Sequence, residues 1–176
     1  MFKNLIIFSF TLFIISCGNE EKPKGKRDVV VPKDTMINRN KEWAIQERAV
    51  IDDYVSRKQW NVITTGTGLR YVIYQHGDTL KPTAKDGQIV TVDYKIYLLE
   101  NDSLCYASEG IPESFKVAMD NVESGLHEAM SYLRVGDKAK IILPSYLAFG
   151  LIGDMDKVPP QSPLVYDIFL LKIADE

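Results

Sequence analysis

Apolar and polar positions alternate over much of the second half of the chain, which is the period of half-buried β-strands. The clearest example is QIVTVDYKIYLL at residues 88–99, where Val90, Val92, Tyr94 and Ile96 alternate with a more polar set. Shorter runs of the same kind occupy residues 69–75, 104–106, 115–119, 138–143 and 164–173. We expect these runs to form an antiparallel sheet.

Residues 38–60 have a helical period instead and contain neither Gly nor Pro. Their apolar side chains recur at spacings of three, four and seven, which places them on one stripe of a helix: Trp43, Val50, Ile51, Tyr54 and Val55. Asn38 or Asn40 is the expected N-cap. We expect this leader helix to pack on the domain that follows it; a helix that dimerises is the alternative.

A second, shorter helix is expected between two of the strands. Ser124 is a suitable N-cap, and Leu126, Ala129, Met130 and Leu133 share one face. Gly136 is the expected left-handed stop. Strands with one short amphipathic helix among them indicate an α+β fold, a bent antiparallel β-sheet wrapped on that helix and preceded by the N-terminal helix.

The first residues have the pattern of an export signal. An apolar run from Leu5 to Ile15 follows Lys3, and it is shorter than the roughly 20 residues that span a bilayer. The ending IISC resembles a bacterial lipobox, which implies cleavage before Cys17 and acylation of that cysteine; an ordinary cleaved signal is the alternative. The expected organisation is a lipoprotein signal peptide (1–16), a flexible tether (17–37), the leader helix (38–60) and one domain (61–176).

Composition narrows the function. The net charge of −3 offers no basic footprint for nucleic acid. The two cysteines, Cys17 and Cys105, are too few for a structural zinc cluster, and lipid on Cys17 leaves no partner for a disulfide. The two histidines, His76 and His127, lie far apart in the sequence and are expected at the surface. We therefore expect no metal and no cofactor.

The loop PSYLAFGLIGDMDKVPP, residues 144–160, is too apolar for an ordinary surface loop and too rich in Gly and Pro for a helix or strand. Together with VTVDY, VESGLHEAM, LRVGDKAKIILPS and the closing VPPQSPLVYDIFLLKI, it resembles the FKBP-type peptidyl-prolyl isomerases over Leu69 to Lys172. The lipobox and helical leader resemble the gliding-motility-associated lipoprotein branch of that family. The resemblance implies an FKBP-like half-barrel in which this loop arches over an apolar pocket.

The resemblance also implies the residues of the pocket. Tyr94 would orient a substrate carbonyl, although a core tyrosine is the alternative reading, and the backbone N–H of Glu123 would donate to a carbonyl. The implied catalytic set is Tyr94, Phe115, Val122, Glu123, Leu126, Phe149 and Tyr166, and the implied substrate-binding set is Cys105, Tyr106 and Val158.

This chain departs from the family pattern at several of these positions. Leu126 replaces a tryptophan of the pocket floor, and Phe149 replaces a tyrosine whose hydroxyl donates to bound ligand. Cys105-Tyr106-Ala107-Ser108 stands where the family has Phe-Asp-Ser-Ser; a slip of one residue would make Tyr106 the wall aromatic, and neither register supplies a carboxylate. We therefore expect reduced isomerase activity.

The expected function is a lipid-anchored isomerase that faces the periplasm and assists the folding of exported envelope proteins. Its expected partners are Pro-containing clients, the membrane through the anchor, and envelope motility or secretion proteins. A non-enzymatic FKBP-fold binding module or chaperone, and an interaction subunit of an envelope machine, are the alternatives. Both faces of the last strand are apolar, with Phe169 and Leu171 opposite Tyr166, Ile168 and Leu170; a covering leader helix or a partner explains this.

Overall fold

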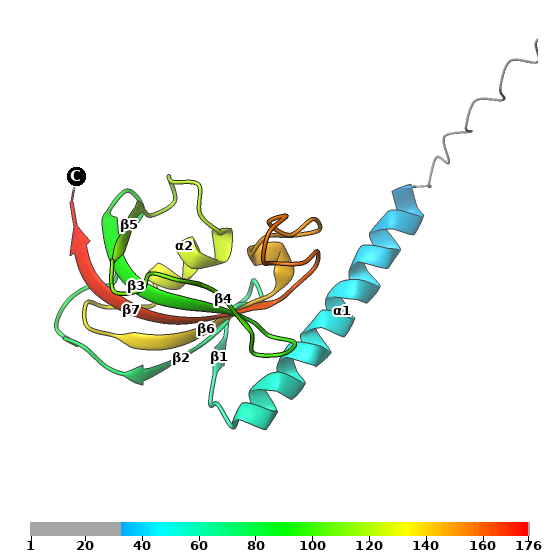
Figure 1. Ribbon diagram of the computed structural model, residues 1–176, viewed down its shortest axis with the longest axis horizontal. Coiled ribbons are helices and arrows are strands. Elements are labelled where there is room, and N and C mark those ends of the chain that lie inside the picture. Colours follow the sequence, from blue (N-terminus) through cyan, green and yellow to red (C-terminus); the bar gives the residue numbers. More distant parts are fainter. Residues whose placement is uncertain (1–32, 176) are drawn as a thin grey trace, which may run out of the picture.

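The computed structural model describes residues 33–175 (Figure 1). The expected signal peptide at 1–16, Cys17 and most of the expected tether lie outside the described residues. Helix α1 runs from Lys33 to Lys58. The prediction that residues 33–37 belong to a flexible tether is therefore wrong, and Asn38 and Asn40 lie inside the helix and do not cap it. Between residues 33 and 175, no helix has the length and apolar character needed to cross a membrane.

The strands form one seven-stranded antiparallel sheet, which confirms the α+β fold class. Their order is β1-β2-β6-β7-β3-β4, and β5 pairs separately with β3. The bounds are β1 (Ile63–Thr64), β2 (Arg70–Gln75), β3 (Ile89–Leu98), β4 (Leu104–Ala107), β5 (Glu113–Lys116), β6 (Lys138–Leu143) and β7 (Leu164–Ala174). The long strands bend around the short helix α2 (Figure 1).

Strand β3 changes partner along its length. Residues Ile89–Val92 pair with β5, whereas Lys95–Tyr97 pair with β4. At the crossing, the Tyr94 N–H donates to the Ser108 hydroxyl at 3.0 Å, the Ser108 N–H donates to the Tyr94 carbonyl at 3.1 Å, and the same hydroxyl donates to the Asp93 carboxylate. Ser108 thus satisfies the backbone where no strand continues the ladder.

Helix α2 (Ser124–Met130) packs on the concave face of the sheet. Its buried face carries Leu126, Ala129 and Met130, as the sequence predicts. Ser124 is the first helical residue and not the N-cap; Glu123 precedes it without a capping side-chain hydrogen bond. Gly136 has the expected positive φ of 93°, but it lies in the turn before β6 rather than at the helix end, and its N–H donates to the Leu170 carbonyl.

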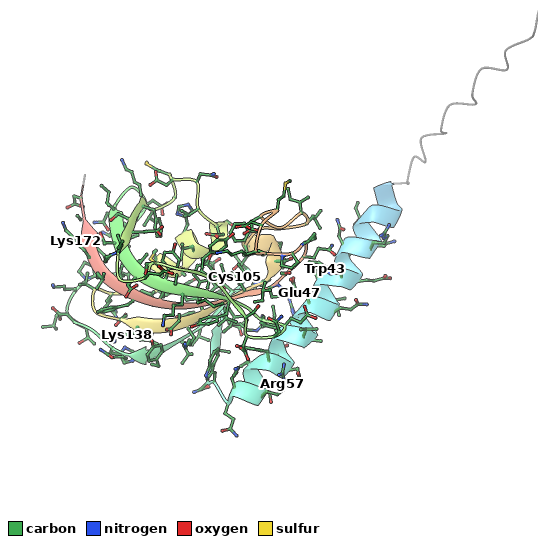
Figure 2. The ribbon with its side chains drawn as sticks, viewed as in Figure 1. Trp43, Glu47, Arg57, Cys105, Lys138 and Lys172 are labelled. Carbon is green, nitrogen blue, oxygen red and sulfur yellow. The ribbon has the colours of Figure 1, made fainter. Side chains whose placement is uncertain are left out.

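The C-terminal half of α1 packs on the other face of the sheet. Ile51 and Tyr54 are buried there in a second apolar cluster with Leu99, Ile142 and Val165. Val50, expected on the same stripe, is 51 % exposed. Positions 47, 51, 54 and 58, spaced by four, three and four, contact the domain instead. Figure 2 shows Glu47 on the side of α1 that faces the domain.

Hydrogen bonds and ion pairs also join this face of α1 to the domain. The Tyr54 hydroxyl donates to the Asp102 carboxylate at 2.6 Å, and Lys58 reaches the same carboxylate at 2.8 Å. Arg70, buried on β2, donates to Asp52 on the helix at 2.6 Å. Asp102 lies in the β3–β4 turn, so α1 is joined to two separate parts of the domain.

The leader helix covers only part of the apolar outer face of β7. Val165 belongs to the cluster beneath α1, whereas Phe169 lies outside that cluster. The ammonium group of Lys138 sits 5.0 Å from the centre of the Phe169 ring and covers it instead. The apolar residues on the outer face of β7 are therefore covered in two ways: Val165 by the leader helix, and Phe169 by the side chain of Lys138.

Candidate active site

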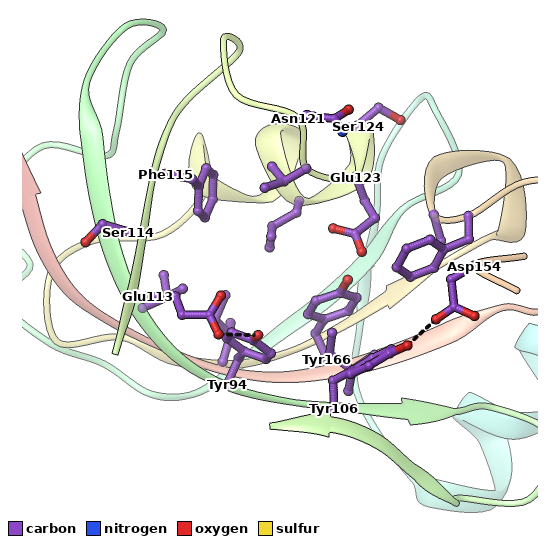
Figure 3. A pocket seen from close by; sticks show the side chains of 17 residues that line it. Tyr94, Tyr106, Glu113, Ser114, Phe115, Asn121, Glu123, Ser124, Asp154 and Tyr166 are labelled. Atoms are coloured by element: carbon purple, nitrogen blue, oxygen red, sulfur yellow. Dashed lines mark hydrogen bonds between the residues drawn. The ribbon is translucent and has the colours of Figure 1, made fainter. Parts of the chain in front are cut away.

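A pocket of about 590 Å³ opens between α2, strands β3, β5 and β7, and the loop from residue 144 to 163 (Figure 3). It brings together eight of the ten residues expected from the sequence to form the site. They are Tyr94, Tyr106, Phe115, Val122, Glu123, Leu126, Phe149 and Tyr166. Val92, Tyr94 and Ile96 face the pocket together because alternate residues of a strand share one face.

Cys105 and Val158, expected to bind substrate, are core residues that do not line the pocket. Cys105 is buried, and its sulfur lies 3.8 Å from the carbonyls of Ser103 and Lys157. Burial raises the pKa of its thiol. Tyr106 lines the pocket in its place, which corresponds to the register slipped by one residue.

Two tyrosine hydroxyls of the pocket donate to carboxylates that the sequence did not place there. Tyr94 donates to Glu113 on β5 at 2.8 Å, and Tyr106 donates to Asp154 in the loop (Figure 3). Burial and the Glu113 carboxylate raise the pKa of Tyr94 to about 12. The hydrogen bond to Asp154 and burial raise the pKa of Tyr106 to about 12. Both hydroxyls therefore remain protonated donors at neutral pH.

Asp154 is held as an anion. Burial by itself would raise its pKa, but the hydrogen bonds that it accepts from Tyr106 and from the N–H groups of Asp156 and Val158 lower it below the usual value. The Cys105–Ser108 segment itself supplies no carboxylate, as expected. Asp154 in the loop after β6 brings a carboxylate to the pocket instead.

The hydroxyl of Tyr166 has no hydrogen-bond partner among residues 33–175, although its side chain is only 1 % exposed. It points into the pocket toward the carboxylate of Glu123 (Figure 3). Burial and the negative charge of Glu123 raise the pKa of Tyr166. An unpaired buried hydroxyl costs about 1–3 kcal/mol, so the Tyr166 hydroxyl would gain stability from a ligand that forms a hydrogen bond with it.

The backbone N–H of Glu123 is likewise without a hydrogen-bond partner in the described part of the chain. It precedes the first turn of α2, whose Leu126 and His127 N–H groups already donate to the Glu123 carbonyl. The free N–H is available to donate to a ligand carbonyl, which is the role that the family resemblance implies for it.

The loop that carries Phe149 and Asp154 is fixed by its own backbone. Gly153 has a φ of 70°, and a Cβ at that position would lie 2.1 Å from the Val158 carbonyl. The Asp154 N–H donates to the same carbonyl, and Asp154 Oδ1 accepts from the Val158 N–H at 2.8 Å. Only glycine allows this close turn, so the loop holds its apolar residues over the pocket.

His127 is half-buried and has a structural role, which corrects its expected surface position. Its Nδ1 accepts from the Ala118 N–H at 2.9 Å, and its Nε2 lies 3.0 Å from the Asp120 carbonyl. The ring also meets the Phe115 ring edge-on at 5.6 Å. His127 thus ties α2 to the loop after β5 and positions one wall of the pocket.

Comparison with known proteins shows the family of the chain. Residues 81–171 match the family described as FKBP-type peptidyl-prolyl cis-trans isomerase. This chain belongs to that family. The isomerase match covers the whole pocket, because every lining residue falls between 81 and 171.

Relatives extend the similarity beyond the isomerase domain. FkpA of Escherichia coli is 30 % identical over 155 residues, which cover 88 % of this chain and 53 % of that protein. A probable FkpA of Neisseria meningitidis is 35 % identical over 114 residues, 64 % of this chain and 40 % of that protein. The crystal structure of FkpA from Escherichia coli superposes with a TM-score of 0.63 at 29 % identity, covering 80 % of this chain and 64 % of that one. The chain spans about half the length of the curated relatives that it matches.

Sequence reasoning missed several polar residues of this pocket: Glu113, Ser114, Asn121 and Asp154. A signal for Glu113 was present, because it lies two residues before Phe115 and so shares its face of β5. Asp154 had no such signal, since a loop without regular period brings it to Tyr106.

Proposed function

We propose that this pocket catalyses the cis–trans isomerisation of peptidyl-prolyl bonds. The observation that carries the proposal is the free N–H of Glu123 at the edge of a pocket with apolar walls. A prolyl ring fits against Phe115, Leu126 and Phe149, and the N–H holds a neighbouring carbonyl.

The reaction breaks no covalent bond, so walls and a few donors suffice. Rotation about a peptide bond meets a barrier of about 18–20 kcal/mol, and the twisted transition state is less dipolar than the planar amide. An apolar site stabilises that form relative to the ground state. An acceleration of about four decades requires roughly 5–6 kcal/mol of differential stabilisation.

Activity is expected to be lower than in relatives that keep a tyrosine hydroxyl in the loop. Phe149 supplies the wall but not the donor. One hydrogen bond contributes about 0.5–1.5 kcal/mol, which corresponds to about tenfold or less in rate.

We further propose that the protein is held at the bacterial envelope by lipid on Cys17 and faces the periplasm. Its clients would be exported proteins that contain proline, and its leader supports a link to envelope motility or secretion proteins. Helix α1, with 26 residues, is ~39 Å long. Its C-terminal half packs on the domain, so only the N-terminal half, about 20 Å long, would act as a rigid spacer between the pocket and the membrane surface.

The decisive experiment is the exchange rate of a short X-Pro peptide series, measured by NMR with the purified protein and with buffer alone. We expect line broadening or exchange peaks that grow with enzyme concentration. A rate equal to that of buffer at high protein concentration would reject the isomerase proposal.

A second candidate function is a binding module or chaperone that grips unfolded segments. Leu151, Ile152 and Met155, at the tip of the loop that borders the pocket, are 62 %, 64 % and 85 % exposed. Exposed apolar side chains beside a peptide site favour capture of apolar client segments. Replacing all three by serine should then weaken suppression of client aggregation while leaving peptide isomerisation in place.

A further inference from the structure

The charged side chains of the pocket are all acidic. Among its 17 lining residues are Glu113, Glu123 and Asp154, and none of the 17 is Lys, Arg or His. Figure 3 shows the three carboxylates around one cavity: Glu113 beside Tyr94, Asp154 beside Tyr106, and Glu123 above Tyr166. Like charges gathered at a concave site give it a negative potential that favours cationic ligands.

Two of these carboxylates already accept hydrogen bonds from tyrosines, whereas Glu123 faces an unpaired group. Glu113 is engaged by Tyr94, and Asp154 by Tyr106. The Glu123 carboxylate points toward the Tyr166 hydroxyl, which is buried and has no partner among the described residues. An ammonium or guanidinium group beside the Glu123 carboxylate would donate hydrogen bonds to it, and the Tyr166 hydroxyl lies next to the same carboxylate as a further polar partner.

The two roles of Glu123 determine where such a cation would lie on the substrate. Its backbone N–H is free to hold a carbonyl close to the prolyl bond. Its side chain belongs to the same residue, so the carboxylate reaches only side chains near that carbonyl. We therefore place the cation on a residue next to the proline.

Another part of the same wall already binds a cation. The ammonium group of Lys157 lies 4.8 Å from the centre of the Tyr106 ring, and the hydroxyl of the same tyrosine donates to Asp154. This contact places a positive charge over the face of a pocket tyrosine, which is the same chemistry that a lysine of the substrate would meet. Lys157 also offsets part of the negative charge at this edge of the pocket.

We propose that the pocket selects prolyl segments in which a lysine or arginine adjoins the proline, with Glu123 and Tyr166 as the cation-binding pair and Asp154 and Glu113 as supporting charges. This substrate preference rests on the proposed isomerase function. Partly exposed ion pairs are each modest, and several together give a preference of about threefold to tenfold over an uncharged residue.

The test uses the purified protein and matched peptides Ala-X-Pro-Phe and Ala-Pro-X-Phe, with X as Lys, Arg, Gln or Glu. NMR exchange gives kcat/KM for each. We expect Lys and Arg to exceed Gln by about threefold to tenfold in one of the two series and Glu to fall below Gln. Raising the salt from about 0.05 M to about 0.5 M should shrink the Lys-to-Gln ratio in the wild-type protein.

Variants that remove one negative charge show which carboxylates cause the preference for cationic peptides. The Lys-to-Gln ratio should fall toward one in Glu123→Gln and fall in part in Asp154→Asn. The matched control is Glu100→Gln, an exposed acid of the β3–β4 turn outside the pocket, which should keep the wild-type ratio. If Glu123→Gln does not fold, two results still test the cation preference: the salt dependence of the Lys-to-Gln ratio in the wild-type protein, and the ratio in Asp154→Asn. A ratio that changes in neither would overturn the preference.

The outcomes separate this proposal from the isomerase function. Equal rates for Lys, Gln and Glu peptides would overturn the cation preference while leaving the isomerase function intact. If no peptide is isomerised, the isomerase function fails, and dissociation constants of the same peptides from chemical-shift titration decide the preference. Equal dissociation constants would then overturn it, and tighter binding of the Lys peptides would support it.

Discussion

The carboxylate of Glu47 on α1 accepts a hydrogen bond from the backbone N–H of Ser145, 98 residues further along the chain, at 2.8 Å. Ser145 begins the short 3₁₀ turn (Ser145–Leu147) that leads into the loop over the pocket. The leader helix thus fixes the start of the pocket loop. Glu47 is 5 % exposed, and its second carboxylate oxygen has no partner in the described part of the chain.

This burial makes the charge of Glu47 costly. Burial raises its pKa by more than the hydrogen bonds from Ser145 and the charge of Arg70 lower it. A carboxyl whose folded pKa is raised contributes stability below its unfolded pKa, and this contribution is lost as pH rises through the folded pKa. Glu47→Gln keeps an acceptor for Ser145 without the charge, so we expect a higher melting temperature than wild type at pH 7.

The difference in melting temperature between the two proteins should narrow as the pH falls toward 4.5, the ordinary pKa of a glutamate. Thermal unfolding followed by circular dichroism at several pH values measures it. Glu42→Gln, an exposed acid on the same helix, should show no such dependence. A Glu47→Gln protein that is less stable than wild type by the same amount at every pH would contradict this account.

The packing of α1 predicts opposite results at two adjacent positions. Ile51→Ala removes a side chain with no exposure from the second cluster and should cost about 2–5 kcal/mol of unfolding free energy. Val50→Ala, at a 51 % exposed position, should stay within about 0.5 kcal/mol of wild type. Urea unfolding measures both. Equal losses, or dissociation of a dimer by either change, would favour a dimerising helix.

Tyr166→Phe should separate stability from function. Removing a buried hydroxyl without a partner should raise the unfolding free energy by about 1 kcal/mol, while removing a group that meets the substrate should lower kcat/KM. Tyr94→Phe is the control for stability, because its hydroxyl is paired with Glu113 and its loss should not stabilise the fold. Unchanged kcat/KM in a stabilised Tyr166→Phe protein would show that this hydroxyl does not meet substrate.

Phe149→Tyr restores a hydroxyl to the pocket loop. We expect an increase in kcat/KM of up to about tenfold, the scale of one hydrogen bond in the transition state. Tyr146→Phe removes a hydroxyl from the same loop outside the pocket, where it donates to the Thr67 carbonyl at 2.7 Å, and should leave kcat/KM unchanged. No gain in a folded Phe149→Tyr protein would mean that this ring only fills the wall.

Cys17→Ala tests the lipid anchor. Without the thiol there is no site for the first acyl chain, so we expect loss of labelling by a radioactive or alkyne-bearing fatty acid and loss of membrane fractionation. Cys105→Ala is the matched control, because that buried thiol is not near a lipobox. Lipid labelling that persists in Cys17→Ala would reject the anchor.

The sequence predicts the strands and the apolar pocket walls because a period of two and the family motifs report local geometry. It fails at Val50 because adjacent helical residues differ by only about 100° in direction, so an apolar stripe can include a neighbour that faces solvent. It also misses the first turn of α1, since residues 33–37 carry no apolar period.

The polar half of the site depends on contacts that no local pattern encodes. Asp154 meets Tyr106 across 48 residues of chain, and Glu47 meets Ser145 across 98. A loop fixed by Gly153 and a helix that docks through Ile51 bring these pairs together. Such pairs become visible only once the fold is known.

The change of partner along β3 also bears on how the chain behaves before it is fully folded. Where β5 ends and β4 has not begun, Asp93 and Tyr94 would present a short open edge, and Ser108 closes it with its own N–H and hydroxyl. Open edges of this kind recruit strands from other copies and lead to domain swapping or fibrils. One buried serine therefore keeps this edge of the sheet, beside the mouth of the pocket, closed to strands from other copies of the chain.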